Sequence, residues 1–176
     1  DESTEEYGVR VAASLANHFL QSNRMLGLLA YGRETALLEP ARGSQQYARI
    51  LEALALARAE GSLPLARVLE EEERRFGRHS TLIVVTPSAD EEWVEALQSL
   101  VERGTRCAVV LLEPGSFGGT EGALLPFSTL VASDILTYLV RCGDDLSLAL
   151  GPAGAVGEPP SERQKAAAVP GHRWGR

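Results

Sequence analysis

The chain has 176 residues, of which 44% are hydrophobic, and a formal net charge of −7 with an isoelectric point near 5.0. This length and apolar content predict one domain with a hydrophobic core rather than two domains. The acidic balance argues against nucleic acid or an anionic membrane as the main partner, because phosphate groups are bound by clustered Lys and Arg. The sequence shows no apolar run long enough to span a bilayer, and its acidic start is unlike a signal peptide.

The first part of the chain predicts a helix followed by a β-hairpin. Thr4 to Gln21 has apolar residues at helical spacing, and Ser3 with Glu6 fits a capping box. A strand from Met25 to Tyr31 is separated by a tight turn from a partner strand, Thr35 to Glu39. A turn this short permits only antiparallel pairing, so the second strand is expected at a sheet edge.

Two further helices are expected before the first buried strand. One runs from Ser44 to Arg58, and Ser62 is placed to cap the next, with Pro64 in its first turn. Their inward faces are predicted to hold apolar residues at helical spacing: Tyr47, Ile50, Leu51, Leu54, Leu65, Val68, Leu69 and Phe76.

The rest of the chain predicts a parallel sheet with helices on both faces. Three continuous apolar, β-branched runs have the composition of buried parallel strands: Thr81 to Val85, Cys107 to Leu112 and Ile135 to Val140. The connecting helices are expected to end near Arg103, to cover Ala123 to Val131, and to close the domain at Asp144 to Leu150. Residues 151–176 are rich in Gly, Pro, Ala and charge, which predicts a disordered tail.

The two cysteines, Cys107 and Cys142, stand at the ends of predicted strands. There is no CxxC pair and no Cys/His cluster, which argues against a zinc site. We expect a pair of reduced, partly buried thiols, and a disulfide between neighbouring strand ends remains the alternative.

Groups that carry chemistry are sparse in the loops that follow the strands, where open α/β sheets place their sites. The glycine-rich loop at 115–120 lacks both the lysine of a P-loop and the spacing of a dinucleotide turn, and a flexible surface loop is expected there. The three histidines, His18, His79 and His172, are scattered, and no GxSxG elbow is present. Asp144 and Asp145 are interpreted as the cap and first turn of the closing helix. We therefore predict no catalytic residues and no enzyme.

Six segments together resemble the second half of a DUF58 protein. They are residues 3–16 (STEEYGVRVAASLA), 27–32 (GLLAYG), 47–55 (YARILEALA), 61–66 (GSLPLA), 81–88 (TLIVVTPS) and 138–146 (YLVRCGDDL). DUF58 proteins carry a von Willebrand factor A-like domain, and the resemblance covers residues 1–150. No single motif is decisive, but the order and spacing of the six are fairly specific.

The resemblance implies a Rossmann-like, three-layer α/β sandwich of five parallel strands and one antiparallel edge strand. Its first strand would precede residue 1, so it is expected to be absent from this chain. That strand would sit at the centre of the sheet, between the strands at 25–31 and 81–85. The resemblance also implies membrane segments upstream, hence a cytoplasmic domain tethered to a membrane, and a link to MoxR-type AAA+ ATPases.

Domains of this kind often hold a metal at the top of the sheet, and the resemblance locates its remnants here. Ser62 stands where a threonine ligand would be, and Thr86-Pro87-Ser88 stands where an acidic loop would be. Asp90 lies two residues further on and is better explained as a helix cap. No metal or cofactor is expected, and Mg²⁺ or Mn²⁺ with Ser62 as a vestigial ligand remains the alternative.

The functional prediction is a non-enzymatic interaction or adaptor module that works with a MoxR-type AAA+ ATPase in the assembly or maturation of protein complexes. Ser62, Thr86, Ser88 and Asp90 are predicted to line the face that meets this protein partner. The alternative is a small-molecule or nucleotide-binding α/β enzyme whose catalytic loop lies outside this chain.

Overall fold

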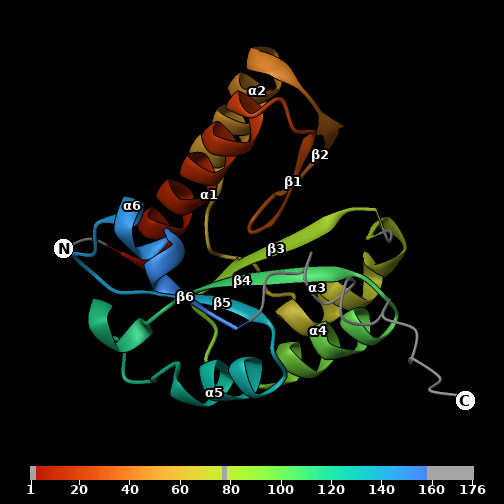
Figure 1. Ribbon diagram of the computed structural model, residues 1–176. Helices are drawn as coiled ribbons and strands as arrows, with labels where there is room; N and C mark the ends of the chain where they lie inside the picture. Colours follow the sequence, from red (N-terminus) through yellow and green to blue (C-terminus); the bar gives the residue numbers. More distant parts are fainter. Residues whose placement is uncertain (1–2, 77–78, 158–176) are drawn as a thin grey trace, which may run out of the picture.

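The strands form two separate sheets (Figure 1). The computed structural model describes residues 3–76 and 79–157. A hairpin of β1 (Leu26–Tyr31) and β2 (Thr35–Ala41) is antiparallel, as predicted. The other sheet has the order β3-β4-β5-β6; its members are β3 (Thr81–Thr86), β4 (Arg106–Leu112), β5 (Leu136–Val140) and β6 (Ala155–Val156). Strands β3, β4 and β5 are parallel and β6 is antiparallel.

Helices cover both faces of the larger sheet, which gives the predicted layered α/β arrangement. The helices are α1 (Thr4–Gln21), α2 (Gly43–Leu56), α3 (Leu65–Glu71), α4 (Glu92–Glu102), α5 (Leu124–Ala132) and α6 (Leu146–Ala149). Three 3₁₀ turns join them: η1 (Glu73–Arg75), η2 (Pro114–Phe117) and η3 (Pro152–Gly154). In Figure 1, α3, α4 and α5 lie below the sheet, and α1 and α6 lie above it.

Helix α1 packs on both sheets. Its predicted capping box is confirmed: the Glu6 amide donates to the Ser3 hydroxyl and the Ser3 amide to the Glu6 carboxylate. In its first half Tyr7 and Val11 are buried against β4 and β5, and in its second half Ala16 and Leu20 are buried against α2 and the hairpin. One helix therefore holds the hairpin and the larger sheet together.

The main core lies between the larger sheet and α4. Trp93, Val94, Leu97 and Leu100 of α4 are buried, and Val101 is partly buried against the same core. Strand β4 is buried from Cys107 to Leu112, as expected of a strand covered on both faces. Strand β3 is not: Leu82, Ile83 and Val85 are only half-buried, because β3 is an end strand of its sheet.

The inward face of α2 differs from the prediction by about one residue. Gln46, Ile50 and Leu54 are buried, while Leu51 remains 38% exposed. Gln46 is drawn inward because its amide nitrogen donates to two strand carbonyls, those of Leu26 at 2.8 Å and Glu39 at 3.0 Å. The pairing of β1 with β2 is irregular beside Leu26, so the Gln46 side chain supplies hydrogen bonds there in place of regular main-chain ones.

Two predicted helix caps were wrong. Ser62 does not cap α3: the helix starts at Leu65 with Pro64 as N-cap and no side-chain cap bond among the described residues. The extended backbone of Pro64 (φ −59°, ψ 144°) delays the first turn past Ser62. At the closing helix Asp145, not Asp144, is the N-cap, and it accepts from the Ser147 amide at 2.8 Å.

The disordered tail was predicted to begin too early in the chain, at residue 151. Residues 151–157 are ordered, because β6 pairs with the open edge of β5, joining Val156 to Thr137 and Ala155 to Tyr138. Main-chain hydrogen bonds to an open edge order a segment that offers little apolar side chain. Residues 158–176 lie outside the described part of the chain. Among the described helices, none has the length and hydropathy to cross a membrane.

Replacing Gln46 with Leu tests the buried amide. The variant keeps the side-chain size but leaves the Leu26 and Glu39 carbonyls without their donor, so the free energy of unfolding should fall by about 1–3 kcal/mol. Urea denaturation measures it, with Gln45→Leu as the matched control on the exposed side of the same turn. Equal stability of the two variants would show that the hydrogen bonds of Gln46 contribute nothing.

Candidate functional site

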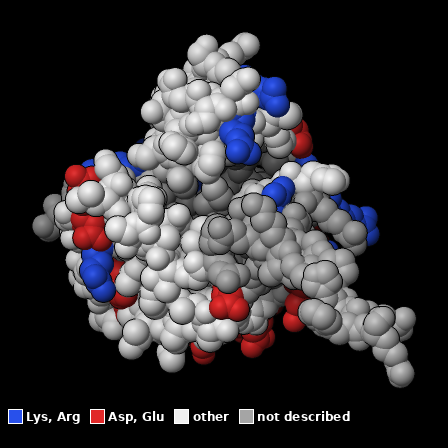
Figure 2. Space-filling view, viewed as in Figure 1, with Lys and Arg blue, Asp and Glu red and all other residues white. Residues whose placement is uncertain are grey.

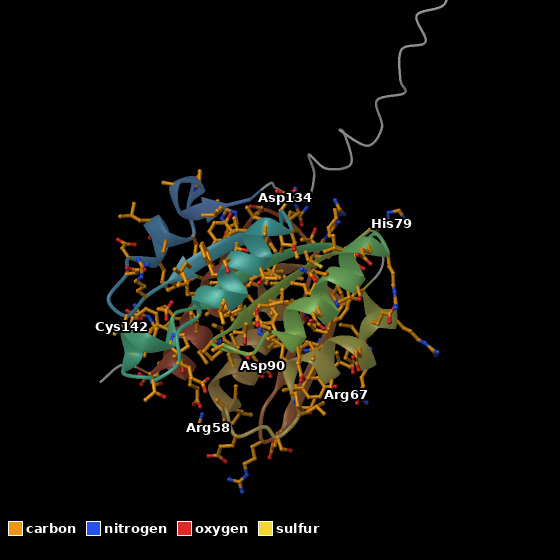
Figure 3. The ribbon with its side chains drawn as sticks, turned by 90° about the horizontal axis from the view of Figure 1, so that it is seen from below. Arg58, Arg67, His79, Asp90, Asp134 and Cys142 are labelled. Carbon is orange, nitrogen blue, oxygen red and sulfur yellow. The ribbon has the colours of Figure 1, made fainter. Side chains whose placement is uncertain are left out.

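The carboxyl ends of β3, β4 and β5 meet at one end of the sheet, as parallel pairing requires. Figure 3 shows Cys142, which follows β5, at this end, and His79, which precedes β3, at the far end. The loop at 57–64 also reaches this end, because the Ala59 amide donates to the carboxylate of Glu5 in the first turn of α1 at 2.8 Å. The three strand loops, the α2–α3 loop and the start of α1 therefore make up the candidate site.

The loop after β3 is held by a ladder of side-chain caps. The Thr86 hydroxyl accepts from the Ser88 amide at 3.1 Å, and the Ser88 hydroxyl accepts from the Asp90 amide at 3.3 Å. The Asp90 carboxylate then accepts from the amide of Glu92, the first residue of α4, at 3.2 Å. The Trp93 indole donates to the Ser88 carbonyl at 3.4 Å. Each cap spans two residues, so the loop is fixed from the strand to the helix.

The four predicted face residues have different surroundings. Ser62 and Asp90 are exposed, Ser88 is half-buried, and Thr86 is buried with 6% of its surface exposed. Thr86 therefore supports the loop from beneath and does not present its side chain to a partner. Glu91, one residue after the predicted cap Asp90, is the N-cap of α4, and the Asp90 carboxylate accepts from the first helical amide, that of Glu92. Among the described residues, no hydrogen bond joins Ser62 to the other three.

The loop after β5 has three successive amides, each bound to a side-chain oxygen. The amide of Arg141 donates to Asp144 at 2.8 Å, that of Cys142 to the Ser116 hydroxyl at 2.9 Å, and that of Gly143 to the Tyr7 hydroxyl at 2.8 Å. Consecutive free amides can bind an anion, but these are already occupied. Tyr7, which is buried in the core beneath α1, thus also ties α1 to this loop.

The glycine-rich loop folds around Glu113. One carboxylate oxygen of Glu113 accepts from the Ala123 amide at 3.1 Å and from the Gly115 amide at 3.4 Å. Gly118 has a positive φ of 86°, and a Cβ on Gly119 would lie 2.9 Å from the Pro114 carbonyl. The amides of Gly115 and Ala123 in this loop are therefore bound by a carboxylate of the chain itself. The prediction of a plain surface loop missed this internal anchor.

A groove of about 730 Å³ opens to solvent between α1 and the loop after β5. It is lined by Tyr7, Arg10, Ala13, Ser14 and residues Gly143 to Ser147. The Arg10 guanidinium lies 4.8 Å from the centre of the Tyr7 ring, and Asp144 and Asp145 also line the groove. The groove is polar and exposes charge of both signs.

The cysteine and histidine side chains of the described residues do not lie together at the candidate site. Both cysteines are free, which confirms the predicted reduced thiols; Cys142 is exposed, not partly buried, and the disulfide alternative is wrong. Burial raises the pKa of Cys107 to about 12. His18 is exposed on α1, and His172 lies outside the described residues. The described residues contain no group of three His, Cys, Asp or Glu arranged to hold a metal ion.

Among curated proteins, none matches the chain significantly. The model of one family, described as "Protein of unknown function DUF58", matches residues 1–117, about two thirds of the chain. The resemblance seen in the sequence is thereby confirmed at the level of the family: the chain belongs to the DUF58 family.

Proposed function

We propose that this chain is a non-enzymatic interaction module that binds a protein partner through the loops at the carboxyl ends of β3, β4 and β5. The observation that carries the proposal is the capped ladder from Thr86 to Glu92, which fixes the loop before any partner arrives. A preordered loop loses little conformational entropy on binding, so more of the contact energy appears as affinity.

The contacts would come from the exposed members of the face. Ser62 and Asp90 are exposed and Ser88 is half-exposed, while Thr86 holds the loop in place. Glu91 and Glu92 extend the exposed acidic surface at the start of α4. This charge favours a partner surface that carries Lys or Arg, since complementary charge speeds encounter and selects partners.

The proposed partner is a MoxR-type AAA+ ATPase, and the proposed role is in the assembly or maturation of protein complexes. The support for this partner is the family resemblance. On the same ground we propose that the parent polypeptide is tethered to a membrane by segments upstream of residue 1, with this domain on the cytoplasmic side.

We also propose that the fold is of the von Willebrand factor A type, completed by one further strand between β1 and β3. Among the described residues, β1 and β3 each have a ladder partner on one side only. All six residues of β1 are half-buried, as are Leu82, Ile83 and Val85 of β3. An apolar strand preceding residue 1 would pair with both edges and finish the burial of these side chains.

Extending the chain upstream tests the added strand. Two new ladders and the completed burial should raise the melting temperature by roughly 5–10 °C. Differential scanning calorimetry of the extended and present chains measures the shift. A control extension of equal length, with each apolar residue of the upstream segment changed to Ser, should give no increase; equal melting of all three chains would contradict the added strand.

Metal should not affect the stability of the present chain. Asp90 is the one carboxylate among the proposed face residues, and one of its oxygens already accepts from the Glu92 amide. Mg²⁺ sites in proteins are usually built on one or two carboxylates, with waters among the six oxygen ligands, and here the single carboxylate already binds the start of α4. Thermal unfolding in EDTA and in millimolar Mg²⁺ or Mn²⁺ should give the same midpoint. A rise of several degrees with either metal would contradict the metal-free proposal.

Substitutions on the face should weaken binding to the cognate ATPase. Asp90→Asn keeps the capping oxygen but removes the charge, and Ser62→Arg adds bulk and a like charge towards a basic partner. Each should raise the dissociation constant about tenfold, which corresponds to a loss of about 1.4 kcal/mol in binding free energy. Biolayer interferometry with the immobilised ATPase measures the change.

The matched control is Glu102→Gln, an exposed neutralisation at the opposite end of the same helix, α4. It should bind as the unsubstituted chain does. If Asp90→Asn and Ser62→Arg bind as tightly as the control, the partner meets another surface. If the unsubstituted chain does not bind the ATPase at all, the proposed partner is wrong.

A further inference from the structure

Four polar side chains connect the hairpin to the segment around the end of α3. Tyr31 ends β1 and Glu39 lies on β2, whereas Glu72 follows α3 and Arg75 lies in η1. The Tyr31 hydroxyl donates to one Glu72 oxygen at 2.9 Å, and the Arg75 guanidinium bonds the other. Arg75 also bonds Glu39 at 2.8 Å. We call these four residues the latch.

Glu72 is the centre of the latch. Its side chain is 16% exposed, against 45% for Arg75 and 73% for Glu39. The Arg75–Glu39 pair on its own is an exposed ion pair of the kind that contributes little. A mostly buried carboxylate that accepts from both a hydroxyl and a guanidinium is held much more firmly. The hydrogen bond to Glu72 is also the main reason why the pKa of Tyr31 is raised, followed by burial and the negative charge of Glu72.

The latch lies on the side of the hairpin that has little apolar packing. Leu26, Leu28 and Leu38 pack against α1 and α2 on the other side. Leu37, whose side chain points to the opposite face of β2 from Leu38, remains 41% exposed. Figure 2 shows the hairpin region as a mostly uncharged upper part, with a hollow between it and the larger sheet. The hairpin is therefore held to the segment at the end of α3 by hydrogen bonds and ion pairs, and not by a packed apolar core.

The chain segments that connect the hairpin and α2 to the rest are exposed. Residues 26–56 form a unit, the hairpin unit, made of β1, β2 and α2. It is joined at one end by residues 22–25 and at the other by residues 57–64, and nearly all of these are exposed. The amide of Arg33 also donates to the carbonyl of Arg58, within the second connection, at 3.2 Å. Connections of this kind can absorb a rotation.

We propose that the latch is a conformational clasp that fixes the angle between the hairpin unit and the larger sheet. When its bonds are broken, the hairpin unit pivots on α1 and the separation between the open edges of β1 and β3 changes. That separation has a functional meaning, since a strand can bridge both edges only when they lie about 9.6 Å apart, two strand spacings. This functional meaning rests on the proposed further strand between β1 and β3, whereas the clasp itself depends on neither that strand nor the proposed partner.

Spin-label distances test the clasp directly. Cys142 on the larger sheet is exposed and can be labelled, while Cys107 is buried with its pKa raised and stays unreactive. The second label goes on Glu34→Cys in the exposed hairpin turn. Pulsed electron–electron double resonance should give one narrow distance distribution for this doubly labelled chain. Adding Tyr31→Phe and Glu39→Gln should at least double its width or produce a second population.

Arg67→Met is the matched control, because it removes ion pairs to Glu70 and Glu71 at 2.8 and 3.7 Å that stay within α3. Its distance distribution should equal that of the parent. If the latch variant, with unchanged circular dichroism, also keeps the parent distribution, the clasp is refuted.

Charge reversal at one exposed latch residue covers the case in which the double variant fails to fold. Glu39→Arg should broaden the distribution, because it places a second guanidinium beside Arg75 and leaves Glu72 untouched. A distribution as narrow as that of the parent chain would overturn the proposal. Ultraviolet titration adds a local readout: Glu72→Gln should bring the raised pKa of Tyr31 back towards its ordinary value, and an unchanged pKa would mean that the bond is not formed.

Discussion

The packing of α1 on two sheets is the constraint on which the rest of the structure depends. Its first half buries Tyr7 and Val11 against the larger sheet, and its second half buries Ala16 and Leu20 against α2 and the hairpin. An 18-residue helix is long enough to serve both cores because its buried stripe drifts slowly around the axis. The same helix anchors the functional end, since the Tyr7 hydroxyl binds the loop after β5 and Glu5 binds the loop after α2.

The carboxyl end of the sheet and the boundary between β1 and β3 are therefore held in different ways. At the carboxyl end of the sheet, side-chain caps from Thr86, Ser116 and Glu113 fix every strand loop, and this rigidity suits a surface that is recognised. Between β1 and β3, apolar residues remain half-buried and the connection relies on polar bonds, which suits a boundary that moves or receives another strand.

The structural features predicted correctly from the sequence were mostly local ones. The capping box of Ser3 and Glu6, the tight hairpin turn at 32–34 and the β-branched strand runs depend on neighbours within a few residues. Long-range contacts were not visible: Gln46 is buried by carbonyls 7 and 20 residues away, and β6 is ordered by β5. At the candidate site, the family resemblance pointed to Ser62, Ser88 and Asp90, which lie in loops at the carboxyl end of the sheet, but the burial of Thr86 and the bond from Gly143 to Tyr7 required the fold.

Among the described residues, β1 and β3 each have a ladder partner on one side only, and α1 packs on both strands. Hydrogen–deuterium exchange followed by mass spectrometry tests it most directly, because amides without a ladder partner exchange faster than paired amides. Peptides covering 26–31 and 81–86 should exchange well ahead of the peptide covering 106–112, the doubly paired strand β4. Equal protection of all three peptides would show that the edges are already satisfied and would contradict the account.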